Sequence, residues 1–253
     1  MCVKPLIVVL LGLLMGAKAM AADIAVFSGD GSPPKMYVQE GKNRGILIDI
    51  LHYAEQQLQE DRLRLALYPW ARAYLQASAG DGGIVGLSWT RRRDDLFDYS
   101  APFFFDEVVI VVRRGHEFPF KTLSDLRGKR VGVVRGASYG EAFERAQNTK
   151  LFVADADNGA RQRLQKLVAG RIDCALFNVG KAGFEETLRI HKEFMPYKDA
   201  LVVLPVPLRS DPNFLAFPKN MQMRPWLDRF NQVIKRGYTR GDIPKIIAQN
   251  LRS

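Results

Sequence analysis

The stretch "EVVIVVRRGHEFPFKTLSDLRGKRVGVVRG" (residues 107–136) decides how this chain is organised. It begins with an almost unbroken apolar run, which is typical of a β-strand covered on both faces, and we predict a strand over residues 107–114. A polar connection then leads to a second β-rich run at residues 129–136. We interpret the connection as a break between two structural units, each with its own strands and helices.

Outward from this stretch, short β-rich runs alternate with amphipathic patterns. The runs that predict further strands are residues 23–28, 63–68, 83–88, 172–178 and 201–206. The segments that predict helices, because apolar residues recur at three- and four-residue spacing, are residues 45–60, 70–80, 138–149, 160–170, 180–194 and 224–251. This alternation predicts an α/β fold with mixed, mostly parallel sheets flanked by helices.

The first 21 residues have the pattern of a secretory signal peptide. Lys4 precedes an apolar run from Leu6 to Met15, and small residues follow up to Ala21. The apolar run is shorter than the roughly 18 residues that a membrane-spanning helix needs. We therefore expect cleavage near Ala21 and export of the remaining chain to the periplasm.

The chain is basic, with a formal net charge of +10, two units of which are Lys4 and Lys18 of the predicted signal peptide. The lysines and arginines are scattered, whereas nucleic-acid sites gather basic residues on one face. The pattern favours a basic, solvated surface, with an anionic ligand or an anionic membrane surface as the alternatives. We expect no nucleic-acid partner.

Cysteine and histidine usage gives no sign of a metal site. Cys174 is the single cysteine after the predicted signal peptide, so it cannot form an intrachain disulfide, and its apolar neighbours predict a buried, inert thiol. His52, His116 and His191 are far apart and show no metal-ligand spacing. The sequence therefore predicts neither a metal nor a cofactor.

Polar and aromatic residues gather after the predicted strands, where ligands of open α/β sheets bind. The hydroxyl groups of Ser88, Thr90 and Ser138 could donate to a carboxylate, and an arginine of the run 91–93 could supply a bidentate fork. Aromatic side chains that could wall the site are those of Tyr37, Trp70 and Trp89. No pattern here activates a nucleophile, so we predict a binding site for a small carboxylate.

Five motifs in a fixed order carry a family resemblance. They are "GILIDILHYA" (45–54), "YPWARAYLQASAG" (68–80), "TRRR" followed by "FDYSAPFFF" (90–105), "LSDLRGKRVGVVRGAS" (123–138) and "LVAGRIDCAL" (167–176). Together they resemble the bacterial extracellular solute-binding proteins of family 3, periplasmic receptors that deliver polar amino acids to ABC transporters. The resemblance covers nearly the whole exported chain.

The resemblance implies a two-lobed periplasmic-binding-protein-like fold of type II, in which two crossing segments join the lobes and the ligand is enclosed between them. It implies a first lobe of residues 22–112 and 204–253 and a second lobe of residues 113–203. The hinge is then expected near residues 107–115 and 198–208.

The resemblance also assigns roles in the site. It implies that Arg93 clamps the ligand carboxylate, that Ser88 and Thr90 line the same corner, and that Ser138 contacts the carboxylate from the second lobe. Asn178 stands where the family usually has an aspartate that binds the α-ammonium group of the ligand. An amide supplies no net negative charge, so the amino half of the site is in doubt.

Two further residues bear on this departure. Lys35 stands where an aromatic residue commonly follows "PP", which adds positive charge near the cleft, and Asp173 is expected to be structural. Lys35 and Asn178 together favour a dicarboxylate, a keto acid or a modified amino acid over a standard α-amino acid.

Each assignment has a plainer structural alternative. Arg93 could form a surface ion pair with a neighbouring aspartate, and Arg91 and Arg92 are expected to face solvent. Ser138 could cap a helix. The remaining alternatives are core packing for Trp70, a turn position for Asn178, and lobe core near the hinge for the phenylalanines at 103–105.

Three functions follow as hypotheses. The first is a non-enzymatic, monomeric receptor that closes over a small carboxylate-bearing, amino-acid-like solute and presents it to the membrane permease of an ABC transporter. The second is an enzyme on the same scaffold that resembles the periplasmic cyclohexadienyl or arogenate dehydratases, which needs an acid in the cleft. The third is a sensory receptor that signals to a membrane kinase or cyclase.

Overall fold

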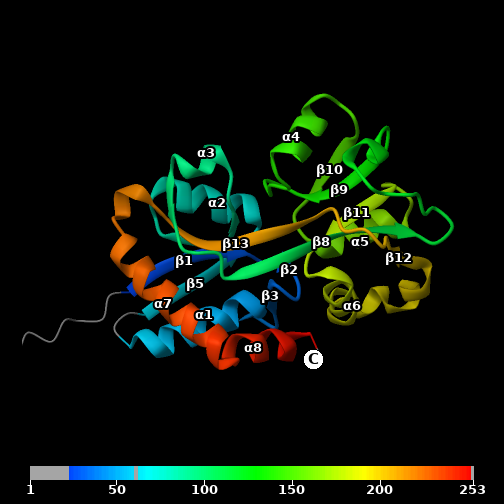
Figure 1. Cartoon of the computed structure of the whole chain (residues 1–253). Helices are drawn as coiled ribbons and strands as arrows, with labels where there is room; N and C mark the ends of the chain where they lie inside the picture. The colour runs from blue at the N-terminus through cyan, green and yellow to red at the C-terminus, as the bar shows by residue number, and fades with distance from the viewer. Residues whose placement is uncertain (1–22, 60–61, 252–253) are drawn as a thin grey trace, which may run out of the picture.

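The computed structural model describes residues 23–59 and 62–251 of the chain. The predicted signal peptide, residues 1–21, lies outside these residues. Within them, no helix combines the length and the apolar character needed to span a membrane. The described chain forms two lobes connected by two long strands (Figure 1).

The first lobe is built on three parallel strands. Strand β1 (Asp23–Gly29) lies between β5 (Arg62–Tyr68) and β6 (Gly83–Ser88). The helices of this lobe are α1 (Ile46–Leu58), α2 (Trp70–Ala79), α7 (Arg224–Arg240) and α8 (Asp242–Asn250). Helices α1, α7 and α8 lie on one side of the sheet and α2 on the other (Figure 1).

The second lobe repeats this arrangement with a smaller sheet. Strand β9 (Arg130–Val134) is parallel to both β10 (Val153–Asp157) and β11 (Cys174–Phe177). The helices of this lobe are α4 (Glu141–Asn148), α5 (Ala160–Val168) and α6 (Gly180–Ile190).

Two antiparallel strands, β8 (Phe104–Arg113) and β13 (Arg209–Pro218), connect the lobes. The first half of β8 pairs with β13, and its second half pairs with β11 of the second lobe and with β12 (Leu201–Val203). Strand β13 continues beside β6 of the first lobe. One sheet thus runs through both lobes, and the predicted lobe boundaries and hinge positions near these strands remain predictions.

Shorter elements complete the described chain. They are a three-stranded sheet of β2 (Gly31–Ser32), β3 (Met36–Gln39) and β4 (Lys42–Arg44), the strand β7 (Phe97–Tyr99), the one-turn helix α3 (Arg91–Asp94), and 3-10 segments at Leu123–Leu126, Lys192–Ala200 and Lys219–Met221.

Alternate residues of β8 belong to different hydrophobic cores. Val108, Ile110 and Val112 pack in one core of the second lobe, whereas Val109 and Val111 pack in the core on the opposite face. Successive side chains of a strand point to opposite faces, so a strand covered on both sides must be apolar throughout. This explains the continuous apolar run in the sequence and confirms the predicted strand.

Several predictions about local structure need correction. The strands β10 and β13 and the three-stranded sheet of β2 to β4 were absent from the predicted elements. The predicted helix 224–251 is two helices, because the backbone turns at Gly241 with a φ of 82°. Phe105 is 62% exposed, which makes its prediction as lobe core wrong, while Phe103 and Phe104 are buried as expected. Cys174 is buried, and burial raises its pKa to about 12, which fits an inert thiol.

Candidate functional site

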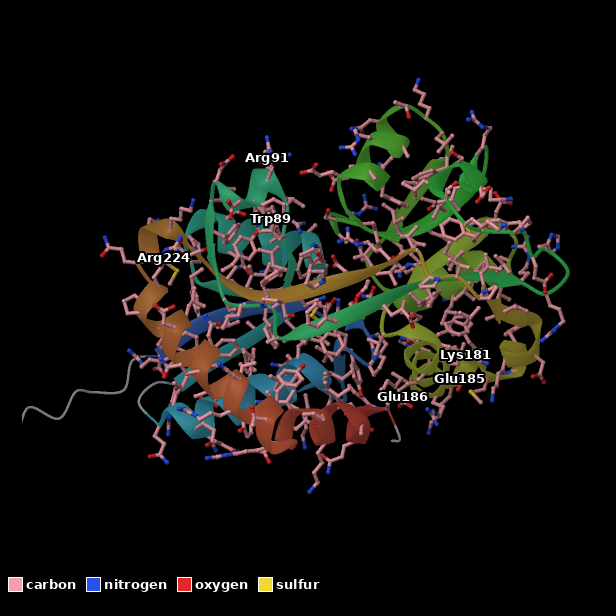
Figure 2. All side chains as sticks on the ribbon, in the orientation of Figure 1. Trp89, Arg91, Lys181, Glu185, Glu186 and Arg224 are labelled. Atoms are coloured by element: carbon pink, nitrogen blue, oxygen red, sulfur yellow. The ribbon has the colours of Figure 1, made fainter. Side chains whose placement is uncertain are left out.

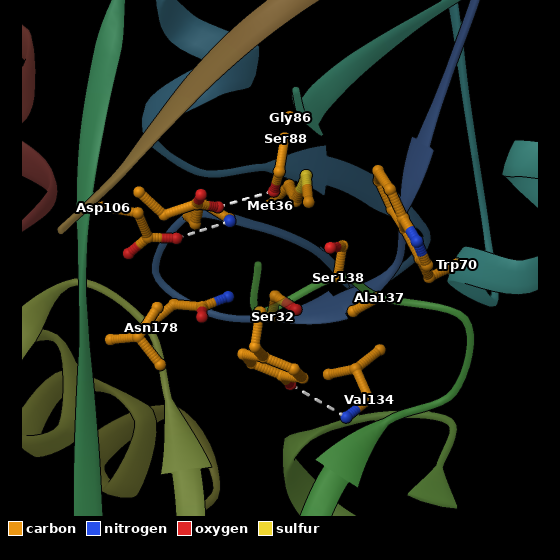
Figure 3. Close-up of a pocket in the computed structure, with 14 residues that line it drawn as sticks. Ser32, Met36, Trp70, Gly86, Ser88, Asp106, Val134, Ala137, Ser138 and Asn178 are labelled. Atoms are coloured by element: carbon orange, nitrogen blue, oxygen red, sulfur yellow. Dashed lines mark hydrogen bonds and ion pairs between the residues drawn. The ribbon is translucent and has the colours of Figure 1, made fainter. Parts of the chain in front are cut away.

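A small chamber of about 40 Å³ lies between the lobes, next to the crossing strands (Figure 3). The residues that line it come from both lobes and from β8 and β13. They are Ser32, Lys35, Met36, Trp70, Gly86, Ser88, Asp106, Val108, Val134, Ala137, Ser138, Tyr139, Asn178 and Asp211. Four of the predicted site residues are in this set: Trp70, Ser88, Ser138 and Asn178.

The apolar wall of the chamber depends on a glycine. Gly86 has a φ of 80°, and a Cβ atom there would stand 2.9 Å from Cε of Met36. A side chain at this position would therefore be strained and would collide with the chamber wall. Trp70, at the start of α2, completes the wall, and its indole Nε1 donates to the carbonyl oxygen of Gly136 in the second lobe at 3.1 Å.

A buried lysine holds the end of the chamber near β8. Nζ of Lys35 lies 2.5 Å from Oδ2 of Asp106 and 3.2 Å from Oδ1 of Asn213. The side chains of Lys35 and Asp106 are only 6% and 1% exposed. In this low-dielectric setting a charge requires a partner, and Lys35 and Asp106 neutralise each other.

Asp106 also connects this pair to the second lobe. Its Oδ1 accepts the backbone N–H of Val179 at 2.6 Å. Val179 has a left-handed backbone with a φ of 65° and precedes α6. Asp106 therefore fixes the turn that follows Asn178, and Asn178 enters the chamber from the end of β11 (Figure 3).

A second carboxylate lies beside the first. Asp211 on β13 is the register partner of Asp106 on β8. Its Oδ2 accepts the hydroxyl of Ser88 at 2.5 Å, and its Oδ1 lies 2.8 Å from Nη2 of Arg209. Burial raises the pKa of Asp211 above its usual value, and the hydrogen bond from Ser88 and the charge of Arg209 oppose that rise.

Arg93 lies outside the chamber and lines a larger cavity of about 600 Å³ that adjoins it through Ala137 and Ser138. The side chain is held in place by the protein. Nη1 donates to the carbonyl oxygen of Ser88 at 3.0 Å, and Nη2 donates to that of Gly136 at 3.3 Å. Its guanidinium also lies over the ring of Tyr74, 5.0 Å from the ring centroid.

Arg93 is buried but has no acidic partner. It is 6% exposed, and none of the carboxylates in residues 23–59 and 62–251 forms an ion pair with it. Of the neighbouring aspartates, Asp98 pairs with Arg224 at 2.7 Å, and Asp94 accepts from the indole of Trp89. The alternative of a surface ion pair for Arg93 is therefore wrong.

Thr90 positions Arg93 through the backbone. It is the N-cap of α3, and its hydroxyl accepts the backbone N–H of Arg93 at 3.3 Å. Arg91 and Arg92 on the same turn are exposed, as expected, and line the outer rim of the larger cavity. Figure 2 shows Arg91 at the outer tip of this segment.

Ser138 lines both cavities. Its hydroxyl donates to Oε1 of Glu144 at 2.6 Å and accepts the backbone N–H of Gly140 at 3.2 Å. Gly140, not Ser138, is the N-cap of α4, so the helix-cap alternative for Ser138 is wrong.

Two predicted aromatic walls are elsewhere in the structure. Trp89 is 47% exposed, and its indole donates to Asp94 at 3.1 Å. Tyr37 lies on β3 in a separate surface cavity with Asp49 and Asn250. Side chains of a strand alternate between faces, so the face that carries Met36 into the chamber carries Tyr37 away from it. The structure does not bring Trp89 or Tyr37 together with the other predicted residues.

The sequence reasoning missed the carboxylates of the chamber. Asp106 and Asp211 are on the crossing strands, and Asn213 is two residues after Asp211 on the same face of β13. The signal that could have found them is the alternation of polar residues within "RSDPNFLAFP", which places Asp211 and Asn213 on one side of a strand. Asp173, expected to be structural, accepts the backbone N–H of Arg130 at 2.6 Å.

Contacts across the cleft hold the lobes together. Thr187 on α6 donates its hydroxyl to the carbonyl oxygen of Pro33 at 2.8 Å. A Cβ atom on Gly31 would stand 2.9 Å from Cα of Gly159. With the bonds to Gly136, these contacts show a closed arrangement of the lobes.

Comparisons with known proteins show which curated proteins and solved structures this chain is similar to. A search of curated proteins finds the L-cystine-binding protein TcyJ of Escherichia coli (strain K12), 27% identical over 167 residues, which is 65% of this chain and 62% of the relative. Among solved structures, an ancestral arginine-binding protein bound to arginine has a TM-score of 0.75 at 21% identity and covers 91% of this chain and 98% of its own.

A histidine kinase sensor domain similar to periplasmic binding proteins has a TM-score of 0.77 at 20% identity, with coverage of 91% and 96%. These likenesses confirm the two-lobed fold. The model of the bacterial extracellular solute-binding proteins, family 3, matches residues 24–252. The chain therefore belongs to the bacterial extracellular solute-binding proteins of family 3.

Proposed function

We propose that this protein is a periplasmic receptor that closes its two lobes over a small, carboxylate-bearing, amino-acid-like solute and delivers it to the permease of an ABC transporter. Family membership supports solute binding. The match to the curated cystine-binding protein covers less than two thirds of that protein, so the solute and the partner of this chain are part of the proposal.

The observation that carries the proposal is Arg93. Arg93 is 6% exposed, and its guanidinium donates to carbonyl oxygens and pairs with no carboxylate of the described residues. A buried charge without a counter-charge is costly, and a planar guanidinium binds a carboxylate through two parallel hydrogen bonds. Arg93 faces the cavity of about 600 Å³ between the lobes, so a carboxylate can reach it there.

The remaining predicted site residues take secondary roles in this proposal. Thr90 holds Arg93 through the N-cap of α3. Ser138 lines both cavities from the second lobe, with its hydroxyl hydrogen donated to Glu144, and Trp70 and Asn178 line the adjoining chamber. Ser88 contributes its carbonyl oxygen to Arg93, because its hydroxyl is engaged by Asp211.

Binding is favoured over catalysis in this proposal. The enzymatic alternative needs an acid that donates a proton to a leaving group. Asp106 is held by Lys35 and Val179, and Asp211 accepts from Ser88, so both carboxylates act as acceptors in the structure. The named relatives are binding proteins. Measurable turnover of arogenate or prephenate by the purified protein would favour the enzymatic alternative.

Calorimetric titration tests the carboxylate clamp. We expect Arg93→Ala to lower the affinity for every carboxylate ligand by about 30-fold or more, because truncating one partner of a buried charge pair typically costs about 2 kcal/mol or more. Arg91→Ala, on the same turn but exposed, is the matched control and should leave affinity within about three-fold, the range of an exposed charge. Equal affinity of the wild type and a folded Arg93→Ala variant would overturn the proposal.

Uptake tests the transport role. A strain that lacks the protein should lose uptake of the radiolabelled solute identified by titration, and the wild-type gene should restore it while Arg93→Ala should not. Normal uptake in that strain, together with loss of a transcriptional response to the same solute, would favour the sensory role instead.

A further inference from the structure

We propose that the solute is an acid without an α-ammonium group, such as a 2-oxo acid or a dicarboxylate, because Lys35 and Arg209 already pair with the two carboxylates of the chamber. This inference rests on the proposed function and specifies the chemical class of the solute.

Both carboxylate oxygens of Asp106 have partners within the protein. Oδ2 lies 2.5 Å from Nζ of Lys35, and Oδ1 lies 2.6 Å from the backbone nitrogen of Val179. With a side-chain exposure of 1%, Asp106 has no face left for a second cation. The protein itself supplies the ammonium group that this carboxylate binds.

Asp211 is the other carboxylate among the described residues that line the chamber. Oδ2 accepts the hydroxyl of Ser88 at 2.5 Å, and Oδ1 lies 2.8 Å from a guanidinium nitrogen of Arg209. This carboxylate also has a cation and a hydrogen-bond donor from the protein. The charge of each acid of the chamber lining is therefore already balanced by a cation of the protein, although Oδ1 of Asp211 accepts no hydrogen bond.

Three side chains of the lining can donate hydrogen bonds into the chamber. Nζ of Lys35 carries three N–H bonds and has two partners within the described chain. The phenol oxygen of Tyr139 accepts the backbone N–H of Val134 at 3.0 Å, which leaves its hydrogen to donate. The side-chain amide of Asn178 has no hydrogen bond to another described residue and offers two further N–H donors.

Together, these groups favour a carboxylate or keto oxygen over an ammonium group in the chamber. An ammonium group in the chamber would meet the like charge of Lys35 and the donors of Tyr139 and Asn178, and both carboxylates of the lining already have a cation from the protein. A carboxylate or keto oxygen would instead accept from Lys35, Tyr139 or Asn178. With its other carboxylate at Arg93 in the adjoining cavity, a 2-oxo acid or dicarboxylate satisfies both ends of the site.

Paired titrations of the wild-type protein test the inference. Each pair shares one side chain and differs only at the α-carbon: pyruvate against L-alanine, 4-methyl-2-oxopentanoate against L-leucine, and 2-oxoglutarate against L-glutamate. Succinate and glutarate form the dicarboxylate arm. We expect the tightest ligand to lack an α-ammonium group and to bind at least 10-fold more tightly than its amino counterpart.

Variants of Lys35 then test the cause. Lys35→Met removes the ammonium group and frees Oδ2 of Asp106, so the preference for the ammonium-free ligand should fall at least 10-fold or reverse. Lys42→Met, at an exposed lysine of β4, is the matched control and should keep the wild-type preference. The double variant Lys35→Met/Asp106→Asn restores neutrality without a free carboxylate. Its affinity for amino acids should not rise.

Asn178→Asp gives an independent check should Lys35→Met fail to fold. It adds a carboxylate to the chamber at a half-buried position and should raise the affinity for amino acids at least 10-fold relative to their 2-oxo counterparts.

The outcomes separate the two proposals. Tight binding of an amino acid that Arg93→Ala abolishes would overturn the inference and leave the proposed function standing. An unchanged preference in both Lys35→Met and Asn178→Asp would also overturn the inference. Failure of the folded wild type to bind any acid in the panel would overturn both proposals.

Discussion

The indole Nε1 of Trp70 in the first lobe donates to the carbonyl oxygen of Gly136 in the second lobe at 3.1 Å. Nη2 of Arg93 donates to the same oxygen at 3.3 Å. One carbonyl oxygen therefore links two side chains of the first lobe to the loop between β9 and α4, and it stabilises the closed arrangement.

Trp70→Phe should favour the open form. It retains an apolar ring in the wall but loses the bond to Gly136, which is worth about 1 kcal/mol, or about five-fold in the equilibrium between open and closed lobes. Small-angle X-ray scattering should show a larger radius of gyration without ligand. Trp89→Phe is the control, because the indole of Trp89 bonds only within its own segment of the described chain, to Asp94. An unchanged radius in Trp70→Phe would contradict this role.

Gly31→Val should prevent full closure without unfolding either lobe. An added Cβ atom would approach Cα of Gly159 to 2.9 Å and the carbonyl oxygen of Asn158 to 3.0 Å, and both residues are in the opposite lobe. We expect little change in the thermal unfolding midpoint without ligand, together with loss of the ligand-induced compaction seen by scattering. Gly31→Ala should give a smaller effect in the same direction, and normal compaction in Gly31→Val would argue against the contact.

Thr90→Val should weaken the support of Arg93. Loss of the N-cap hydroxyl of α3 should lower the free energy of unfolding by about 1 kcal/mol in urea denaturation. Because the cap fixes the turn that carries Arg93, ligand affinity should fall as well. Thr239→Val, at an exposed threonine whose hydroxyl bonds within α7, should leave affinity unchanged. Unchanged affinity in Thr90→Val would show that Arg93 is positioned independently of the cap.

Asp211 should make stability depend on pH in a direction opposite to that of most carboxylates. Burial raises its pKa in the folded protein above the usual value of 3.8, so the folded state holds the proton more strongly than the unfolded state. Its ionisation therefore destabilises the fold above the folded pKa, and this penalty is relieved as the pH falls through that pKa toward 3.8.

Asp211→Asn isolates this effect. The free energy of unfolding of the variant, measured relative to wild type in urea at a series of pH values, should be most favourable near pH 7 and should decline as the pH falls to about 4. Asp23→Asn, at an exposed aspartate whose pKa is lowered by Arg64, is the control with the opposite sign. A difference that stays constant with pH would contradict the raised pKa.

Cys174 should resist alkylation in the folded protein. Burial raises the pKa of its thiol to about 12, so almost none is thiolate at pH 8, and the side chain is fully buried in β11. Mass spectrometry of protein that begins at Ala22 should show no iodoacetamide adduct until denaturant is added. Rapid labelling without denaturant would indicate that the second lobe opens locally.

The sequence predicts the parts of this fold that follow a simple period. Local burial decides the apolar run of β8 and the alternation of strands and helices. Both can therefore be predicted from the sequence. Strand β13 escaped prediction because Asp211 and Asn213 are polar at buried positions and Pro212 interrupts the run. Asp211 lines the chamber and Asn213 accepts from Lys35 beside it, so the residues that build the candidate site mask the local pattern of a strand.

The candidate site shows the same division. Motif position identified Arg93, Ser138 and Asn178 as residues that line the inter-lobe cavities. Trp89 and Tyr37 follow the same rule in the sequence, yet Trp89 is exposed and Tyr37 lies in a separate surface cavity, on the face of β3 opposite to Met36. The pairing of Lys35 with Asp106, residues 71 positions apart in the chain, depends on how the β2–β3 loop meets a crossing strand, and no local pattern encodes that meeting.

The carbonyl oxygen of Gly136 has one more consequence. It accepts from Nη2 of Arg93, so a carboxylate that binds this guanidinium as proposed must displace that bond or use the other N–H groups. A solute that displaces this bond must accept more strongly than the carbonyl oxygen of Gly136. Weakly accepting molecules of the right size therefore do not bind. The affinity for a solute then depends on how much more strongly the solute binds Arg93 than the carbonyl oxygen of Gly136 does.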